Sequence, residues 1–154
     1  MNPVDGHADD RIARYVAASR PPFEALRAIA SQLAGFVLLN TVAPRDYALQ
    51  DVPLHLAASA LDEAVERLRT LMPPAQAAHH HHHLLSAAAS LHQALDLGRH
   101  HLVAVRQPGM AAACEVPLRE GITHLRHAGT ALPGFHLVTL DHACCALHAE
   151  GTGL

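Results

Sequence analysis

Apolar side chains recur at steps of three and four residues through most of this 154-residue chain, and prolines divide the pattern into segments. Such spacing places apolar side chains on one face of an α-helix. The clearest segment contains Phe23, Leu26, Ile29, Leu33, Phe36 and Val37. The pattern therefore predicts a set of amphipathic helices that each bury one face.

Composition supports helices over strands. The chain has about thirty Ala and over twenty Leu, but only five aromatic residues and no Trp. Ala and Leu favour helix, whereas strands prefer β-branched and aromatic residues. A chain of this length buries roughly 70% of its unfolded surface, which is enough for a core. We expect one soluble domain over residues 1–154, with residues 1–8 loose, and neither a sandwich, a barrel nor a disordered chain.

Prolines mark the expected helix boundaries in the first half of the chain. A short helix is expected from Asp9 to Ala18, because Pro21 and Pro22 should stop it and begin the next one. That second helix should end near Leu39 or Asn40. After a connector over residues 41–53, a third helix should use Asp51 as its N-cap, carry Leu54 to Met72 and end at Pro73 and Pro74.

The second half predicts three more helical segments. One begins near Ala75 and closes at residues 107–109, either running straight through Gly98 or kinking there. The next follows Pro117 and ends near Leu132. The last covers about residues 136–149, although its beginning also suits an extended strand. Together the segments predict an all-α fold, a four- to six-helix bundle with short terminal helices.

Charge and cysteine content argue against a nucleic-acid-binding protein and against a disulfide-rich protein. The net charge is −3, and all eleven basic residues are scattered Arg, so the basic stripe of a nucleic-acid-binding protein is missing. Three cysteines do not make a disulfide framework. No signal peptide is visible, and the most apolar stretch, Ala28 to Leu39, is too short to span a bilayer. We expect a cytoplasmic protein that binds neither nucleic acid nor membrane.

The chain contains fifteen histidines, five of them in the uninterrupted run His79–His83. The run is either a solvated helix start or a site of metal capture, since neutral imidazole binds Zn, Cu and Ni. Continuing the apolar stripe of Leu84 and Leu91 backwards places His80 and His81 near the buried face and turns His79 and His82 outward. A buried imidazole needs a partner, either a protein group, a water or a metal ion.

A second group of possible ligands lies near the end of the chain. On a helix, Asp141, Cys145 and His148 share one flank, and zinc accepts all three ligand types. The alternative is that the cysteines pack as small hydrophobes beside an exposed histidine. The pair His124 and His127 lies away from the apolar stripe of its helix and is expected to be surface.

Nucleophilic cysteine chemistry is a further alternative. A nucleophilic Cys144 or Cys145 would need His142 or His148 to depress its pKa, and one short helix leaves little room for a substrate. Cys114, just before an expected helix start, either has a pKa lowered by the helix dipole or is a buried thiol.

Two functional hypotheses follow. The chain lacks paired catalytic carboxylates, a Gly-rich phosphate loop and a Ser/His/Asp arrangement, which favours a binding or interaction module without its own catalysis, forming a homo-oligomer or binding a protein partner. The alternative is a bundle that binds zinc or another divalent transition metal, as a structural or hydrolytic site. Its expected ligands are His80, His81, Asp141, Cys145 and His148.

Overall fold

The computed structural model describes residues 3–42, 52–103 and 110–135, and this part of the chain contains four α-helices and no strand. They are α1 (Pro3–Val42), α2 (Val52–Thr70), α3 (Ala78–Leu97) and α4 (Met110–Ala131). A short 3₁₀ turn, η1 (Ala75–Ala77), precedes α3, and a π-helical turn, η2 (Gly98–Val103), follows it. The predicted all-α bundle is therefore confirmed, with four helices. The predicted helix over residues 136–149 lies outside the described residues.

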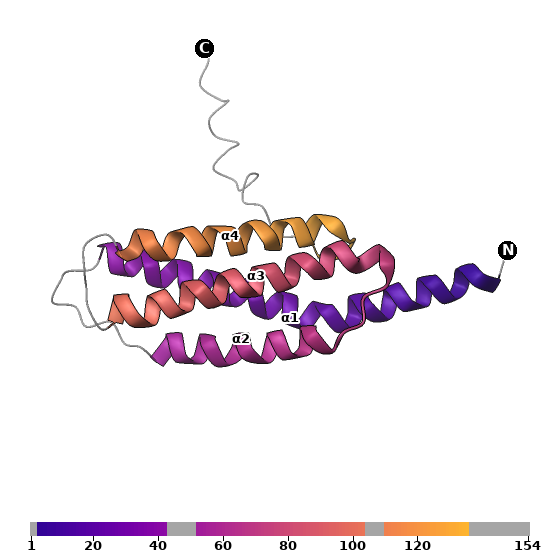
Figure 1. Cartoon of the computed structure of the whole chain (residues 1–154), viewed down its shortest axis with the longest axis horizontal. Coiled ribbons are helices and arrows are strands. Elements are labelled where there is room, and N and C mark those ends of the chain that lie inside the picture. The colour runs from indigo at the N-terminus through magenta and orange to yellow at the C-terminus, as the bar shows by residue number, and fades with distance from the viewer. Residues whose placement is uncertain (1–2, 43–51, 104–109, 136–154) are drawn as a thin grey trace, which may run out of the picture.

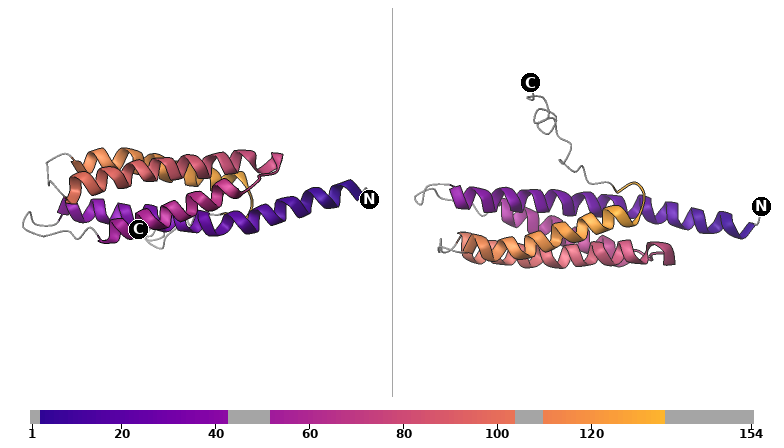
Figure 2. Two further views of the ribbon diagram at one scale, coloured as in Figure 1. Left: turned by 60° about the horizontal axis from the view of Figure 1, so that its bottom comes forward. Right: turned by 90° about the horizontal axis from the view of Figure 1, so that it is seen from above.

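The four helices run alternately in opposite directions along one long axis (Figure 1). Helix α3 packs most extensively against α4, and α1 contacts α2, α3 and α4. The N-terminal part of α1 extends past the ends of the other helices, as both views in Figure 2 show. The bundle proper therefore uses only the later part of α1.

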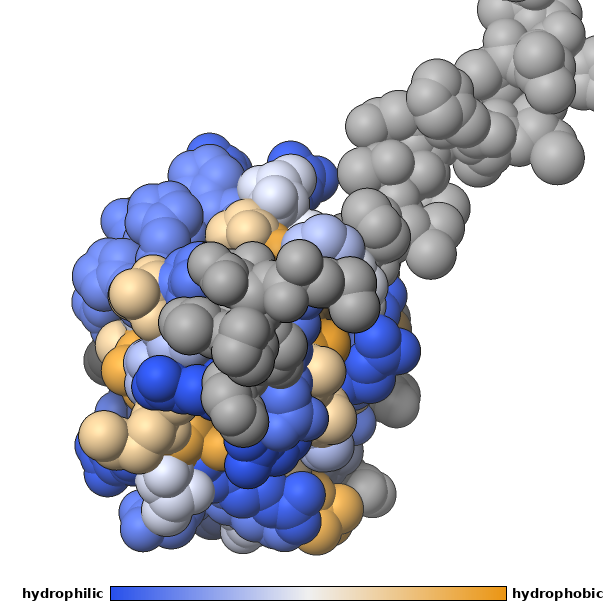
Figure 3. All heavy atoms as spheres, turned by 90° about the vertical axis from the view of Figure 1, so that its right-hand side faces the viewer, coloured by the Kyte–Doolittle hydropathy of each residue, from blue (hydrophilic) through white to orange (hydrophobic). Residues whose placement is uncertain are grey.

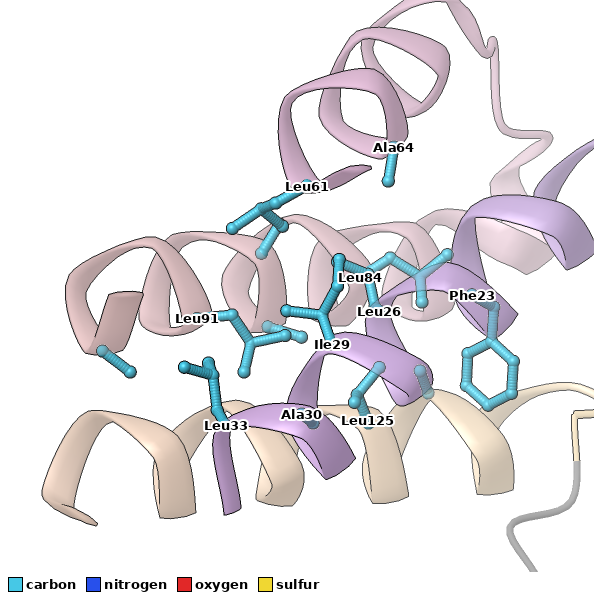
Figure 4. Packing of buried hydrophobic residues seen from close by; sticks show 14 of the residues in the cluster. Phe23, Leu26, Ile29, Ala30, Leu33, Leu61, Ala64, Leu84, Leu91 and Leu125 are labelled. Atoms are coloured by element: carbon cyan, nitrogen blue, oxygen red, sulfur yellow. The ribbon is translucent and has the colours of Figure 1, made fainter. Parts of the chain in front are cut away.

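The core lies between the helices and is almost entirely aliphatic. Figure 4 shows Leu26 and Ile29 of α1 packed towards Leu61 of α2, Leu84 and Leu91 of α3, and Leu125 of α4. Leu26, Leu61, Leu84 and Leu91 are completely buried. These are residues of the apolar stripes, so burial follows the periodicity of the sequence. Burial of a Leu or Ile side chain contributes roughly 1.5–3 kcal/mol.

The prediction of a helix boundary at Pro21 and Pro22 is wrong, because α1 continues through both prolines. Each proline lacks an N–H, so the carbonyls four residues earlier, on Ala17 and Ala18, lose their helical donors. Ala17 and Ala18 are both exposed to solvent, where water can replace the missing donors. Tyr15 and Phe23 are buried on either side, so packing holds the helix together. Helix α1 changes direction along its length (Figure 1), as helices with internal prolines do.

The continuity of α1 also corrects the expected length of the apolar stretch. Within the described residues, one helical segment, Asp9–Val42, is long and apolar enough to cross a membrane by length and composition. The sequence alone indicates only the stretch Ala28 to Leu39, which is interrupted by Ser31 and Gln32 and is shorter than the roughly twenty residues that span a bilayer. A core helix of a soluble protein passes the same test. In this fold Phe23, Leu26 and Ile29 of α1 are buried among the other helices.

At Gly98 the chain neither continues as α-helix nor stops. The α-helical pattern ends at Leu97 and the chain widens into the π-helical turn η2. Such turns usually occur as single turns attached to α-helices. Gly98 is buried, and a Cβ there would lie 3.8 Å from the Leu54 side chain, an ordinary contact.

Helix α4 begins seven residues before the predicted start at Pro117, at Met110. The preceding Ala111 to Ala113 favour helix, and burial of Cys114 and Leu118 anchors the extra turns against the core. Cys114 therefore lies within the helix. Burial raises the pKa of its thiol, which excludes the lowered pKa considered for a residue at a helix start and agrees with a buried thiol.

Close packing of α3 and α4 depends on Gly121. A Cβ at this position would lie 3.1 Å from two carbon atoms of the Leu91 side chain and 3.4 Å from the Ala87 carbonyl oxygen. The missing side chain lets the two helices approach at this level. Gly121 lies one turn before His124 in α4 and so sets how near that histidine comes to α3.

Candidate metal site

The five consecutive histidines occupy the start of α3 and divide between two neighbouring helices. His79 and His83, four residues apart, lie on the side facing α4. His80 and His81 reach Tyr15 of α1 instead. A run that appears uniform in sequence therefore takes part in two separate interfaces, because successive positions on a helix point in different directions.

A cluster of imidazoles lies between α3 and α4, which we call the histidine cluster: His79, His83, His124 and His127. The Nδ1 atom of His83 lies 2.9 Å from Nδ1 of His124, and Nε2 of His83 lies 3.1 Å from Nε2 of His79. The rings of His83 and His127 have centroids 5.0 Å apart. His83 therefore lies at the centre of the group.

Three members of the histidine cluster can hold a metal ion together. His83, His124 and His127 each offer one ring nitrogen, and these atoms all lie within 4.8 Å of one another. Metal–nitrogen bonds of about 2.0–2.1 Å place two ligand nitrogens about 3–3.4 Å apart on one ion. Because the three atoms are spread over as much as 4.8 Å, the rings must rotate inward to bind one ion. His83 is buried, His124 half-buried and His127 exposed, so the group opens to solvent on one side.

The surroundings of His83 keep its ring neutral. Burial lowers the pKa of His83, and the neighbouring His79, His124, His127 and His82 lower it further because a second positive charge would repel the first. Neutral imidazole is the form that binds metal, since the coordinating nitrogen must carry a lone pair. Packing thus favours the neutral form of His83, which is the form that binds metal.

The other face of the run forms a hydrogen-bonded group with α1. The hydroxyl of Tyr15 lies 2.9 Å from Nδ1 of His80 and 3.3 Å from Nδ1 of His81. His80 is 0% exposed, and Phe135 packs on its ring with centroids 4.3 Å apart. Within the described part of the chain, Nε2 of His80 has no hydrogen-bond partner. Burial, with repulsion from His81 and His83, lowers the pKa of His80 to about 4. Burial also raises the pKa of Tyr15 to about 12, so both groups stay neutral near pH 7.

The predicted orientation of the run is confirmed in its main features. His80 is buried, His81 is half-buried, and His79 and His82 are exposed. His80 and His81 contact a tyrosine within the described residues. Their predicted co-ligands, Asp141, Cys145 and His148, lie outside the described residues. The metal site proposed from the sequence with these five residues therefore stays a prediction.

His124 and His127 show what sequence reasoning missed. The expectation that both lie at the surface is confirmed for His127, which is exposed, but not for His124, which is half-buried. Their position on α4 nevertheless brings both to His83. The spacings His79-x-x-x-His83 and His124-x-x-His127 each put two rings on one helix face. The sequence contains both pairs, but not the packing of α3 against α4 that joins them.

The end of the bundle where α3 begins and α4 ends is mostly hydrophilic. Figure 3 views the molecule from that end and shows polar residues in blue, with hydrophobic residues as scattered orange patches. The polar character of this end suits solvated imidazoles rather than an apolar docking surface.

Fold and site together define an all-α, four-helix bundle with a histidine cluster that could hold a metal ion. Comparison with protein-family models, curated proteins and solved structures finds no match. Any functional conclusion therefore rests on the geometry of the chain itself.

Proposed function

We propose that this protein binds a divalent transition-metal ion between α3 and α4, through His83, His124 and His127. The observation that carries the proposal is the convergence of three imidazole nitrogens within 4.8 Å from two different helices. His83 and His124 are 41 residues apart in the sequence, so helical repetition alone does not account for their meeting.

The ligand type identifies the class of ion. Imidazole suits Zn²⁺, Cu²⁺, Ni²⁺ and Co²⁺, whereas Mg²⁺ and Ca²⁺ prefer carboxylate and carbonyl oxygens. The metal-holding group found among the described residues consists only of histidines. Three protein ligands leave one position of a tetrahedral ion for water or a small molecule. The exposed side of the site, at His127, is where that position would face.

Bound metals should first be measured on untagged protein purified without a metal column. Mass spectrometry of the intact protein and titration calorimetry with Zn²⁺ should give one ion per chain. Replacement of His83, His124 or His127 by Ala should weaken binding by more than the roughly 10–100-fold typical of residues outside the coordination shell. His92→Ala is the matched control, since His92 is on α3 but pairs with Asp62, at 3.1 Å.

The same titration separates the two possible ligand sets. Loss of binding in His148→Ala or Cys145→Ala, with His83→Ala unaffected, would overturn the proposed site in favour of the set predicted from sequence. Absence of binding in the wild-type protein would contradict both sets.

A second function, as an interaction module, has its own supporting observation. Large apolar side chains are exposed where α1 ends and α2 begins: Leu38, Leu39, Val42, Val52 and Leu56, from 52% to 67% exposed. Clusters of this kind often contact another chain. Light scattering should show a dimer or larger oligomer that Leu39→Glu and Leu56→Glu dissociate. A monomeric wild-type protein would contradict self-association.

A further inference from the structure

The imidazole of His83 meets a different histidine at each of its two nitrogens. Nδ1 faces Nδ1 of His124 at 2.9 Å, and Nε2 faces Nε2 of His79 at 3.1 Å. These two nitrogens lie on opposite edges of the ring, so a single ion coordinates only one of them. His79 is also not part of the group His83, His124 and His127, whose ligand atoms lie within 4.8 Å of one another. An ion held by Nδ1 of His83 therefore leaves His79 outside the coordination shell.

Coordination at Nδ1 determines where the proton of His83 must be. Neutral imidazole carries one N–H, so an ion on Nδ1 forces this proton onto Nε2. His83 is only 8% exposed, and a buried N–H without an acceptor costs about 1–3 kcal/mol. Nε2 of His79 is within hydrogen-bonding distance and, when it carries a lone pair, is the acceptor this N–H needs.

We propose that His79 is a positioning residue of the metal site, which accepts a hydrogen bond from Nε2–H of His83. This inference rests on the proposed metal-binding function. The hydrogen bond fixes the tautomer of His83, holds its ring in the orientation that aims Nδ1 at the ion, and increases the basicity of that nitrogen. His79 is placed for this role by the i, i+4 spacing on α3, and the two rings are 4.4 Å apart.

The test replaces His79 with side chains that differ in their ability to accept a hydrogen bond. His79→Gln keeps an acceptor, His79→Leu removes it, and His79→Lys offers only donors. We expect the Leu and Lys variants to bind Zn²⁺ about 10–100-fold more weakly and the Gln variant to stay close to the wild type. The number of ions bound per chain should be unchanged in all three. His82→Leu is the control, because His82 is also exposed and contacts the His83 ring, with centroids 5.5 Å apart.

The hydrogen bond itself gives a readout that a purely structural role would not change. Proton and nitrogen NMR of the zinc-bound protein should show the Nε2–H of His83 in a hydrogen bond, with a downfield proton shift, in the wild type and in His79→Gln but not in His79→Leu. If all three His79 variants bind Zn²⁺ with the affinity of the wild-type protein, the inference is overturned while the metal site stays in place. Two ions in the wild type, reduced to one in His79→Leu, would instead make His79 a ligand of a second ion. If the wild-type protein binds no ion, the proposed function itself fails.

Discussion

At the scale of single residues, five identical side chains in a row have different chemical environments. His80 is completely buried against Phe135, whereas His79 and His82, its near neighbours, are exposed. The difference arises because each step along a helix turns the side chain to another direction. The buried histidines of the run therefore take up a proton less readily than the exposed ones, since charging a desolvated imidazole is unfavourable.

His80 should make folding stability depend on pH. Its pKa is about 4 in the folded protein, against 6.5 for an ordinary histidine. As the pH falls below 6.5, the unfolded chain takes up a proton that the folded chain does not, so stability decreases down to about pH 4. The full effect is at most about 3 kcal/mol. Urea unfolding at pH 7.5, 6, 5 and 4 should show a shallower pH dependence in His80→Leu than in the wild type. Identical slopes would contradict the prediction.

The hydroxyl of Tyr15 should be needed as the hydrogen-bond partner of the buried His80 ring. In Tyr15→Phe the hydroxyl that faces Nδ1 of both His80 and His81 is lost, which leaves neither nitrogen of His80 with a hydrogen-bond partner among the described residues. An unsatisfied buried polar group costs about 1–3 kcal/mol. Chemical denaturation at pH 7.5 should therefore show a lower free energy of unfolding. Arg14→Ala is a surface control on the same helix, because its ion pair with Asp10 is exposed on both sides and contributes little. Unchanged stability in Tyr15→Phe would show that the hydroxyl contacts contribute nothing.

At the scale of elements, packing between helices determined where the helices begin and end more than the prolines in the sequence did. Pro21, Pro22 and Pro117 all lie inside helices, although proline interrupts the backbone hydrogen bonds. Buried neighbours on both sides of each proline keep the helix continuous. The contact between α3 and α4 is in turn set by the smallest residue available, Gly121.

Gly121→Val should loosen the contact between α3 and α4. Its Cβ alone would lie 3.1 Å from the Leu91 side chain, so Leu91 must give way by a few tenths of an ångström, and the two methyl groups of Val add to the crowding. We expect a loss of about 1–3 kcal/mol in unfolding free energy and weaker metal binding, because His124 lies on the next turn. The control is Gly35→Val in α1, where no atom of the described residues lies within 4 Å of the added Cβ. Equal stability of the two variants in thermal unfolding would contradict a tight α3–α4 contact.

At the scale of the whole molecule, the histidine cluster joins α3 to α4 at one end of the four-helix bundle. An ion bound there would hold together two helices that already pack closely. Ligands that bind only the folded state stabilise it by mass action.

Zn²⁺ should therefore stabilise the entire fold. At a free concentration 100 times the dissociation constant, the gain is about 2.7 kcal/mol. Thermal unfolding followed by circular dichroism should show a higher midpoint with Zn²⁺ and a return to the original value with EDTA. His83→Ala should show no such shift, while His92→Ala should behave as the wild type. A shift of equal size in His83→Ala would place the bound ion elsewhere.

The helical class and most of the core could be predicted from the sequence. The stripes containing Leu26, Leu61 and Leu91 are buried as expected, because apolar periodicity reports directly which face of a helix avoids water. Helix boundaries at prolines were less predictable. Their outcome depends on whether tertiary packing compensates for a lost hydrogen bond, and this information is not local.

The candidate site divides in the same way. The sequence by itself determined that His80 is turned inward and that His79 and His82 are turned outward, since helical geometry relates each residue to its neighbours in the chain. Only the tertiary structure decided that His83 meets His124 and His127. Contacts between residues so far apart in sequence depend on the register and distance of two packed helices. Side-chain volume at positions such as Gly121 sets that distance, and no local pattern encodes it.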